Sequence, residues 1–397
     1  MLQAEYFFSY ALMKKKLFLF FFSLLSSSTN FAQEVATGYY RVQNANTKRY
    51  AALYDTKAKV DKLATNADLS AIRTYYYYDR IVSDPASVIY IDSENGNYAL
   101  KVQGSSTREM MGEYSLIIKK ASAIAYTAYG TYNNYSVYLC DEGFDDGKSF
   151  SSDADTLAYM ATSGNLKYWY INAISSADDT NYFGFKPDLK VGNDYYQSFY
   201  ASFPFSFAST NTKAYYIDKK SDERGIVELK EFTGQDLPAS TPMIIKSNSD
   251  NPSDNRVNLL TSSVTAPSDN LLTGVYFCSV PSQFVWYDQI YNHDNYVENN
   301  PTTMRVLQVQ DGALVLKKVD WKYIPRNSFY MSVSTSAPDV YRVLSPEDYL
   351  TGIHAVISDS QSEKAGDVYN LSGQKVGDNT DILPHGVYIQ NGIKILK

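Results

Sequence analysis

The sequence predicts a mainly β protein: a β-trefoil-like domain first, then a two-part, β-sandwich-like domain, then a short C-terminal β-hairpin segment. Three observations carry this prediction. The 397-residue chain holds 37 tyrosines and 19 phenylalanines, and aromatic residues favour strands. Short apolar runs end at turns rich in Asn, Ser, Thr and Asp. Two strand patterns repeat along the chain, which is too long for one core.

Residues 1–32 predict a leader that directs export. Lys14-Lys15-Lys16 is followed by the apolar residues 17–25 and by a small, polar stretch that ends at Ala32. This order is typical of a cleaved secretory signal peptide, and its apolar core is too short to span a bilayer. Residues 1–12 precede it and are expected to result from an upstream start site. No later segment reaches transmembrane length, so we expect an outer-membrane surface or extracellular protein, with the periplasm as the alternative.

Residues 33–195 are expected to form the β-trefoil-like domain. One predicted hairpin joins Tyr39–Asn44 to Arg49–Leu53, and a second joins Val88–Ile91 to Asn97–Val102. Their Tyr-Ala pairs lie 48 residues apart, and degraded copies are expected over 132–139 and 168–174. Such repeats predict a β-trefoil or a related barrel.

The opening GYYRVQNANTKRY resembles the first strand pair of ricin-type β-trefoil domains, and Trp169 with residues 181–184 resembles their last repeat. Lectins of that type carry a Gln-x-Trp element in each repeat, and this chain has none. The resemblance therefore implies the architecture rather than the sugar site. Within this domain a helix is expected over Asn66–Tyr78, because its apolar residues recur at helical spacing.

Residues 196–346 contain an internal duplication. Gly225–Lys230 leads to Leu237-Pro238 and a further strand, and Gly312–Lys317 leads to Ile324-Pro325 and a further strand at the same spacing, 87 residues later. Each copy predicts a strand, a loop, a proline that fixes the turn, and a strand. The runs YASFPFSF, VELKEF and LPASTPMIIK resemble a region common in Bacteroidales surface proteins, which implies location more than activity.

A polar linker is expected over 347–366, with a helical turn opening at Pro346, before a β segment over 367–397. In that segment Asn391-Gly392 is typical of a type I′ hairpin turn, which sets Tyr388 opposite Ile395 and Val387 opposite Leu396. The run DVYNLSGQKV followed by LPHGVYIQNGIKILK resembles the type A C-terminal sorting domains of the type IX secretion system. The resemblance implies export or anchoring machinery as a partner.

The charge and the rarer residues exclude several function classes. The net charge is −7, or −9 without the leader, and no basic cluster predicts binding to nucleic acid or anionic membranes. Cys140 and Cys278 leave open one disulfide or two buried thiols. Three histidines without metal-ligand spacing, no Gly-x-Ser-x-Gly element and no phosphate loop predict neither an enzyme nor a cofactor.

Two loops are candidate sites. Asp141, Asp145 and Asp146 form a weak calcium candidate, for which an ordinary solvated turn is the alternative. A polar insertion between the two copies carries Trp286, Tyr287, Tyr291 and Asn295, and exposed aromatic rings of this kind stack on sugars. Trp169 is a further candidate, although either tryptophan could instead belong to the core.

The function expected from these features is a secreted or cell-surface binding protein without catalytic activity. It would recognise a glycan or an extracellular matrix protein through aromatic-lined loops. The alternatives are a structural or assembly protein of the envelope and, least favoured, a glycoside-hydrolase-like enzyme with paired carboxylates.

Overall fold

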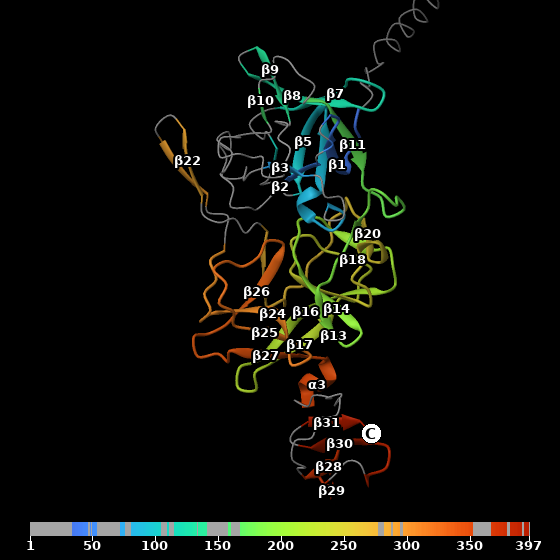
Figure 1. Ribbon diagram of the computed structural model, residues 1–397, viewed down its shortest axis with the longest axis vertical. Helices are drawn as coiled ribbons and strands as arrows, with labels where there is room; N and C mark the ends of the chain where they lie inside the picture. Colours follow the sequence, from blue (N-terminus) through green and yellow to red (C-terminus); the bar gives the residue numbers. More distant parts are fainter. Residues whose placement is uncertain are drawn as a thin grey trace, which may run out of the picture.

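The protein is described by a computed structural model at residues 34–46, 48, 50–53, 72–75, 81–104, 109–110, 115–132, 134–140, 158–159, 167–276, 282–286, 289–293, 297–351, 367–378, 382–390 and 393–396. Strands dominate these residues, which confirms the mainly β prediction (Figure 1). The predicted leader and Cys278 lie outside them. None of the described helices is long and apolar enough to cross a membrane.

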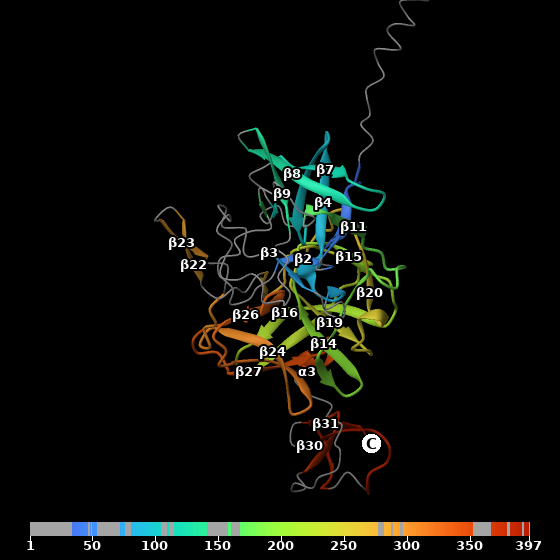
Figure 2. The same ribbon diagram turned by 45° about the horizontal axis from the view of Figure 1, so that its top comes forward.

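Six antiparallel strands form a closed ring in the first unit, which spans residues 34–173. In ring order they are β1 (Gly38–Asn44), β4 (Ile89–Glu94), β5 (Asn97–Val102), β7 (Ile117–Lys120), β8 (Tyr126–Tyr132) and β11 (Trp169–Ala173). A bridge between Tyr98 and Leu116 joins β5 to the start of β7. Figure 2 shows this unit at the end of the molecule opposite the C-terminal sheet.

The remaining strands of the first unit lie outside the ring and follow β1, β5 and β8 in the chain. They are β2 (Tyr50–Leu53) and β3 (Ile72–Tyr75), then β6 (Glu109–Met110), then β9 (Tyr135–Leu139) and β10 (Ala158–Tyr159). Both predicted hairpins are present: β1 pairs with β2, and β4 pairs with β5. The ring favours the trefoil-like arrangement, which itself stays a prediction.

The prediction of a helix over Asn66–Tyr78 is wrong at Ile72–Tyr75, because these residues form strand β3. This strand pairs with all four residues of β2. The open edge of β2 offers hydrogen-bond partners, and the β-branched Ile72 and Thr74 favour extended backbone. The rest of the expected helix lies outside the described residues.

The second unit, residues 181–344, is built on a ten-stranded sheet that contains the predicted duplication. One copy has the strand order β14 (Asp194–Phe199), β19 (Met243–Ser247), β16 (Thr212–Ser221), β17 (Ile226–Glu231). The other has the matching order β21 (Leu272–Val275), β26 (Ser328–Ser332), β24 (Met304–Gln310), β25 (Ala313–Lys317). Strand β27 (Val340–Leu344) joins the copies, parallel to β17 and antiparallel to β25, and β13 (Leu189–Val191) extends the edge at β14.

The two copies share their turn conformations. Gly225 and Gly312 both have positive φ, +59° and +72°, at the hairpin that precedes β17 or β25. Pro238 and Pro325 hold matching positions in the two copies. Two residues after each of them, Ser240 and Asn327 have φ of +52° and +51°. Left-handed residues at the same two places give both copies a similar chain path, which favours the predicted duplication.

A second, four-stranded sheet packs on one face of the ten-stranded sheet. Its strand order is β12 (Phe183–Gly184), β20 (Arg256–Leu259), β15 (Phe205–Phe207), β18 (Asp236–Leu237). A phenylalanine cluster fills the space between the sheets and consists of Phe183, Phe185, Phe199, Phe203 and Phe205. The arrangement is therefore sandwich-like, as predicted. Because β12 and β13 pair with strands of this unit, the sheets divide the chain between β11 and β12, before the boundary expected near residue 195.

The C-terminal segment forms a sheet of its own beyond the single helical turn α3 (Pro346–Thr351), which begins where it was predicted. The strand order is β29 (Lys375–Gly377), β28 (Val368–Asn370), β30 (Val387–Gln390), β31 (Ile393–Leu396). Tyr388 pairs with Ile395 and Val387 with Leu396, so the predicted register is confirmed.

Raising the pH above about 10 is expected to destabilise the fold, because buried tyrosines resist ionisation. Burial raises the pKa of the Tyr39 and Tyr200 hydroxyls well above the usual range, and the neighbouring Tyr90 and Tyr276 add to the respective shifts. The unfolded chain releases these protons from about pH 10, while the folded chain keeps them. The contribution of these tyrosines to the free energy of unfolding is therefore fully present below that pH and is lost as the pH rises. Urea unfolding at about pH 9 and pH 11 checks this: a smaller loss in Tyr200→Phe supports it, and equal stability at both pH values would contradict it.

Candidate binding site

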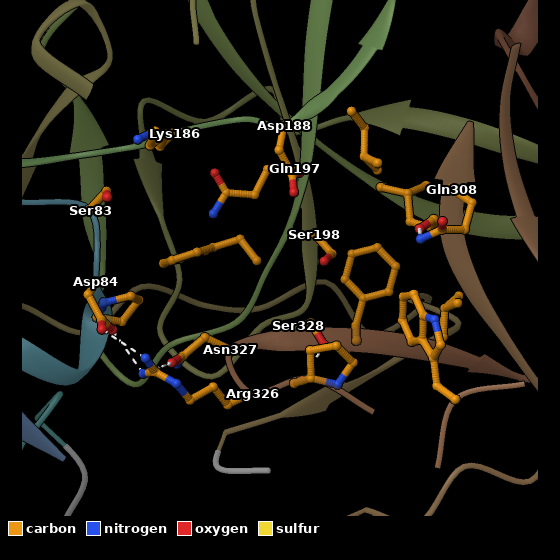
Figure 3. A pocket seen from close by; sticks show the side chains of 18 residues that line it. Ser83, Asp84, Lys186, Asp188, Gln197, Ser198, Gln308, Arg326, Asn327 and Ser328 are labelled. Carbon is orange, nitrogen blue, oxygen red and sulfur yellow. Dashed lines mark hydrogen bonds and ion pairs between the residues drawn. The ribbon is translucent and has the colours of Figure 1, made fainter. Parts of the chain in front are cut away.

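A cavity of about 380 Å³ lies between the two units and is called here the interdomain cavity (Figure 3). The first unit contributes the turn Ser83–Pro85, and the second unit contributes strands β14 and β24 and the segment 321–329. Its polar lining residues are Ser83, Asp84, Lys186, Asp188, Gln197, Ser198, Gln308, Arg326, Asn327 and Ser328. The volume falls within the range of about 300–1,000 Å³ that is typical of small-molecule sites, which favour domain interfaces.

The cavity forms because the ten-stranded sheet curls until its two ends approach each other. Strand β14 lies against β26, and β13 lies against β24, without a described backbone ladder between them. Two hydrogen bonds hold this approach: the Tyr200 N–H donates to the Asn327 carbonyl at 3.1 Å, and the Asn327 Nδ2 donates to the Tyr200 carbonyl at 2.9 Å. The left-handed backbone of Asn327 therefore helps to place one wall of the cavity.

An ion pair between Asp84 and Arg326 ties the two units together at one end of the cavity (Figure 3). The Arg326 Nη1 and Nη2 donate to Asp84 Oδ1 and Oδ2 at 2.9 and 2.8 Å, a bidentate geometry. Asp84 Oδ1 also accepts the Ala86 N–H at 3.0 Å. The side chains are only 12% and 24% exposed, so solvent screens this pair less than a surface pair.

A double-mutant cycle with Asp84→Asn and Arg326→Gln is expected to show coupling of about 1–3 kcal/mol in the free energy of unfolding. The physical reason is the bidentate, partly buried geometry. The cycle of Lys375→Gln and Asp367→Asn, an ion pair whose side chains are 48% and 50% exposed, provides the control and is expected to show less than about 1 kcal/mol. Equal coupling in the two cycles would contradict a special role for the interdomain pair.

Two glutamines, Gln197 and Gln308, line the cavity, and each has a side-chain amide atom without a described hydrogen bond. The side chain of Gln197 on β14 has no described hydrogen bond, and its oxygen is buried. Gln308 on β24 lies at the end of the cavity opposite Asp84 (Figure 3) and donates from Nε2 to the Leu307 carbonyl at 2.6 Å. Buried polar groups are nearly always hydrogen-bonded, so a partnerless amide beside a cavity indicates a ligand or water contact.

An indole and a balanced set of charges complete the lining. Trp321 is 39% exposed although it is a large aromatic residue. The charged lining residues are two cations, Lys186 and Arg326, and two anions, Asp84 and Asp188. The lining is thus formally neutral, partly aromatic and rich in amides and hydroxyls.

Of the residues predicted as ligand-binding, Trp169 is the one whose side chain the structure describes, and it does not line this cavity. Trp169 is 1% exposed, and its Nε1 donates to the Leu139 carbonyl at 2.8 Å, so the candidate role of Trp169 is corrected to a core residue. Trp286 and Tyr291 lie on the hairpin of β22 (Ser282–Trp286) and β23 (Gln289–His293), whose side chains are not described. Tyr287, Asn295 and the calcium candidates Asp141, Asp145 and Asp146 lie outside the described residues.

The sequence did carry one signal for the missed tryptophan. Trp321 occupies the loop before the proline of the second copy, where the first copy has Gly234 at the same spacing of 87 residues. A large aromatic residue in place of glycine, in a duplicated loop, is a departure from the repeat. The difference between the copies marks Trp321 as a residue that the shared strand pattern does not require.

Comparison with known proteins gives no family for this chain. No protein-family model matches it, and no curated protein is significantly similar to it. Among the described residues, no three or more side chains of the metal-binding types gather into a group that could hold an ion. The chemistry of the interdomain cavity is therefore the main guide to function.

Proposed function

We propose that the chain is an exported, non-catalytic binding protein that holds part of a glycan in the interdomain cavity. The observation that carries the proposal is the exposed indole of Trp321 in the same cavity as the partnerless amide of Gln197. Aromatic faces stack on the apolar C–H faces of sugars, while a few placed polar groups bind their hydroxyls.

The carboxylates of the cavity favour binding over hydrolysis. Glycosidases use two carboxyl groups on either side of the scissile bond, one of which must carry a proton. Both oxygens of Asp84 already accept hydrogen bonds from Arg326, which leaves Asp188 as the one lining carboxylate without a described ion pair. A single carboxylate of this kind does not make the acid and base pair of a glycosidase.

Export is the second part of the proposal. The predicted leader would carry the chain across the inner membrane, and the C-terminal sheet would serve as the sorting or anchoring segment, in line with its resemblance to type A sorting domains. Its support is that strands β28–β31 form a separate ladder after the linker. We therefore propose the outer-membrane surface or the extracellular space as the location.

A structural role in the envelope is the second candidate. It is favoured by exposed apolar side chains on the C-terminal segment, where Leu371, Ile382 and Leu396 are 64%, 79% and 76% exposed. Apolar groups of this kind mark contact surfaces when they lie together.

A glycan array probed with the purified exported chain and with Trp321→Ala tests the proposed function. We expect a specific signal that the substitution weakens by about tenfold or more while circular dichroism stays unchanged. The Trp321 carbonyl accepts from Asn299 Nδ2 at 2.8 Å through the backbone, and alanine retains this bond. A silent array from a folded protein would reject glycan binding and favour the structural role.

A further inference from the structure

We propose that the interdomain cavity selects an uncharged sugar, the terminal neutral pyranose unit of a glycan, and discriminates against acidic sugars. This inference rests on the proposed function and names its ligand class. It follows from the charge, the hydrogen-bonding capacity and the size of the cavity.

The charges of the lining leave no strong site for an anion. Arg326 would be the natural partner of a sugar carboxylate, but Nη1 and Nη2 of its guanidinium already donate to Asp84. Lys186 is exposed, so solvent and salt screen its charge. Asp188, exposed on the same segment, offsets the charge of Lys186, and burying an unpaired charge costs far more than burying a hydroxyl.

The polar groups without partners suit hydroxyls, which both donate and accept. The Gln197 amide offers a donor and an acceptor, and because no described group bonds to it, the amide can turn without losing a hydrogen bond. The Gln308 oxygen and the Ser198 hydroxyl also have no described partner. A ring with several hydroxyls satisfies these groups together, whereas an apolar ligand would leave them unpaired.

The size of the cavity and the ion pair at one end of it favour a terminal unit. The volume of about 380 Å³ is near the lower limit of about 300–1,000 Å³ for ligand pockets, which suits one or two rings rather than a long chain. The Asp84–Arg326 pair lies at one end of the cavity (Figure 3), and its side chains are largely buried, so we place the terminal unit of a glycan against this pair.

Titration calorimetry with the full chain tests the inference. The probes are the methyl pyranosides of glucose, galactose, mannose and N-acetylglucosamine, and the uronates of glucose and galactose. We expect at least one neutral probe to bind and the uronates to bind about tenfold more weakly or not at all. A uronate that binds as tightly as the best neutral probe, or a panel without any binding, would overturn the inference.

Matched variants locate the effect. Gln197→Met and Gln308→Leu are expected to raise the Kd of the neutral probe by about tenfold each, because each leaves a sugar hydroxyl without its partner. Gln310→Leu is the control, since Gln310 lies two residues along the same strand and outside the cavity lining. An unchanged Kd in Gln197→Met, with the fold intact, would contradict the assignment.

The two proposals fail in different ways. A glycan-array signal that persists in Trp321→Ala and is not displaced by any neutral monosaccharide would reject this inference and leave glycan binding elsewhere on the chain. An array without any signal would reject both.

Discussion

Arg41→Leu is expected to lower the free energy of unfolding by about 3–5 kcal/mol, a large part of the 5–15 kcal/mol that is usual for a domain. The Arg41 side chain is fully buried, and its Nη1 donates to Asn181 Oδ1 at 2.8 Å and to the Tyr182 carbonyl at 2.7 Å. Its Nη2 donates to the Ile81 carbonyl at 3.0 Å. Leucine would leave Asn181 Oδ1 and the Tyr182 carbonyl without their donor at the place where the first unit meets the second, whereas the Ile81 carbonyl keeps the Ser87 hydroxyl as a donor. Urea unfolding followed by circular dichroism measures the change.

Arg342→Leu is the matched control for that experiment. Arg342 lies on β27, is partly exposed, and makes no described side-chain hydrogen bond or ion pair. Its replacement is expected to change the free energy of unfolding by no more than about 0.5 kcal/mol. A comparable loss in both variants would show that Arg41 has no special role at the junction.

Gly184→Ala is expected to destabilise the protein by about 3 kcal/mol or to prevent folding. A Cβ at Gly184 would lie 2.9 Å from the carbonyl carbon of Pro252 and closer still to its oxygen. Both belong to the backbone of a short turn, so no side-chain rotation relieves the overlap. The Gly184 N–H also donates to the Val82 carbonyl at 2.9 Å, which links the two units. Thermal unfolding or the yield of soluble protein measures the effect.

Gly38→Ala separates this overlap from the general effect of alanine in a strand. Gly38 lies on β1, and its added Cβ would contact the Tyr40 ring at an ordinary 3.5 Å. We expect a change within about 1 kcal/mol. An equal loss of stability in the two variants would mean that the Pro252 backbone shifts to make room for the added Cβ.

Turn chemistry made much of the fold predictable. Asn391-Gly392 predicted the register that β30 and β31 show, because few residue pairs suit a two-residue hairpin turn. The spacing from glycine to proline predicted two copies, and Gly225 and Gly312 have positive φ at matching places. The expected helix over Asn66–Tyr78 did not hold at Ile72–Tyr75, because pairing with β2 decided the local structure. The spacing of apolar residues in so short a segment does not show whether the segment pairs with a strand from another part of the chain.

The candidate site was not predictable from the sequence to the same degree. Asp84 and Arg326 are 242 residues apart, and only the packing of the two units brings them together. Trp169 and Trp321 are the same residue type, yet one is 1% exposed and the other is 39% exposed. Burial follows from the closed ring around Trp169, which no local pattern reveals.

Hydrogen–deuterium exchange of the full chain, with and without the neutral sugar that binds it, tests the central claim most directly. The account predicts slower exchange at Ser83–Asp84, at residues 197–199 and at residues 326–329, from both units at once. Protection confined to the hairpin of β22 and β23, with no change at the interdomain cavity, would contradict it and return the site to the loop around Trp286.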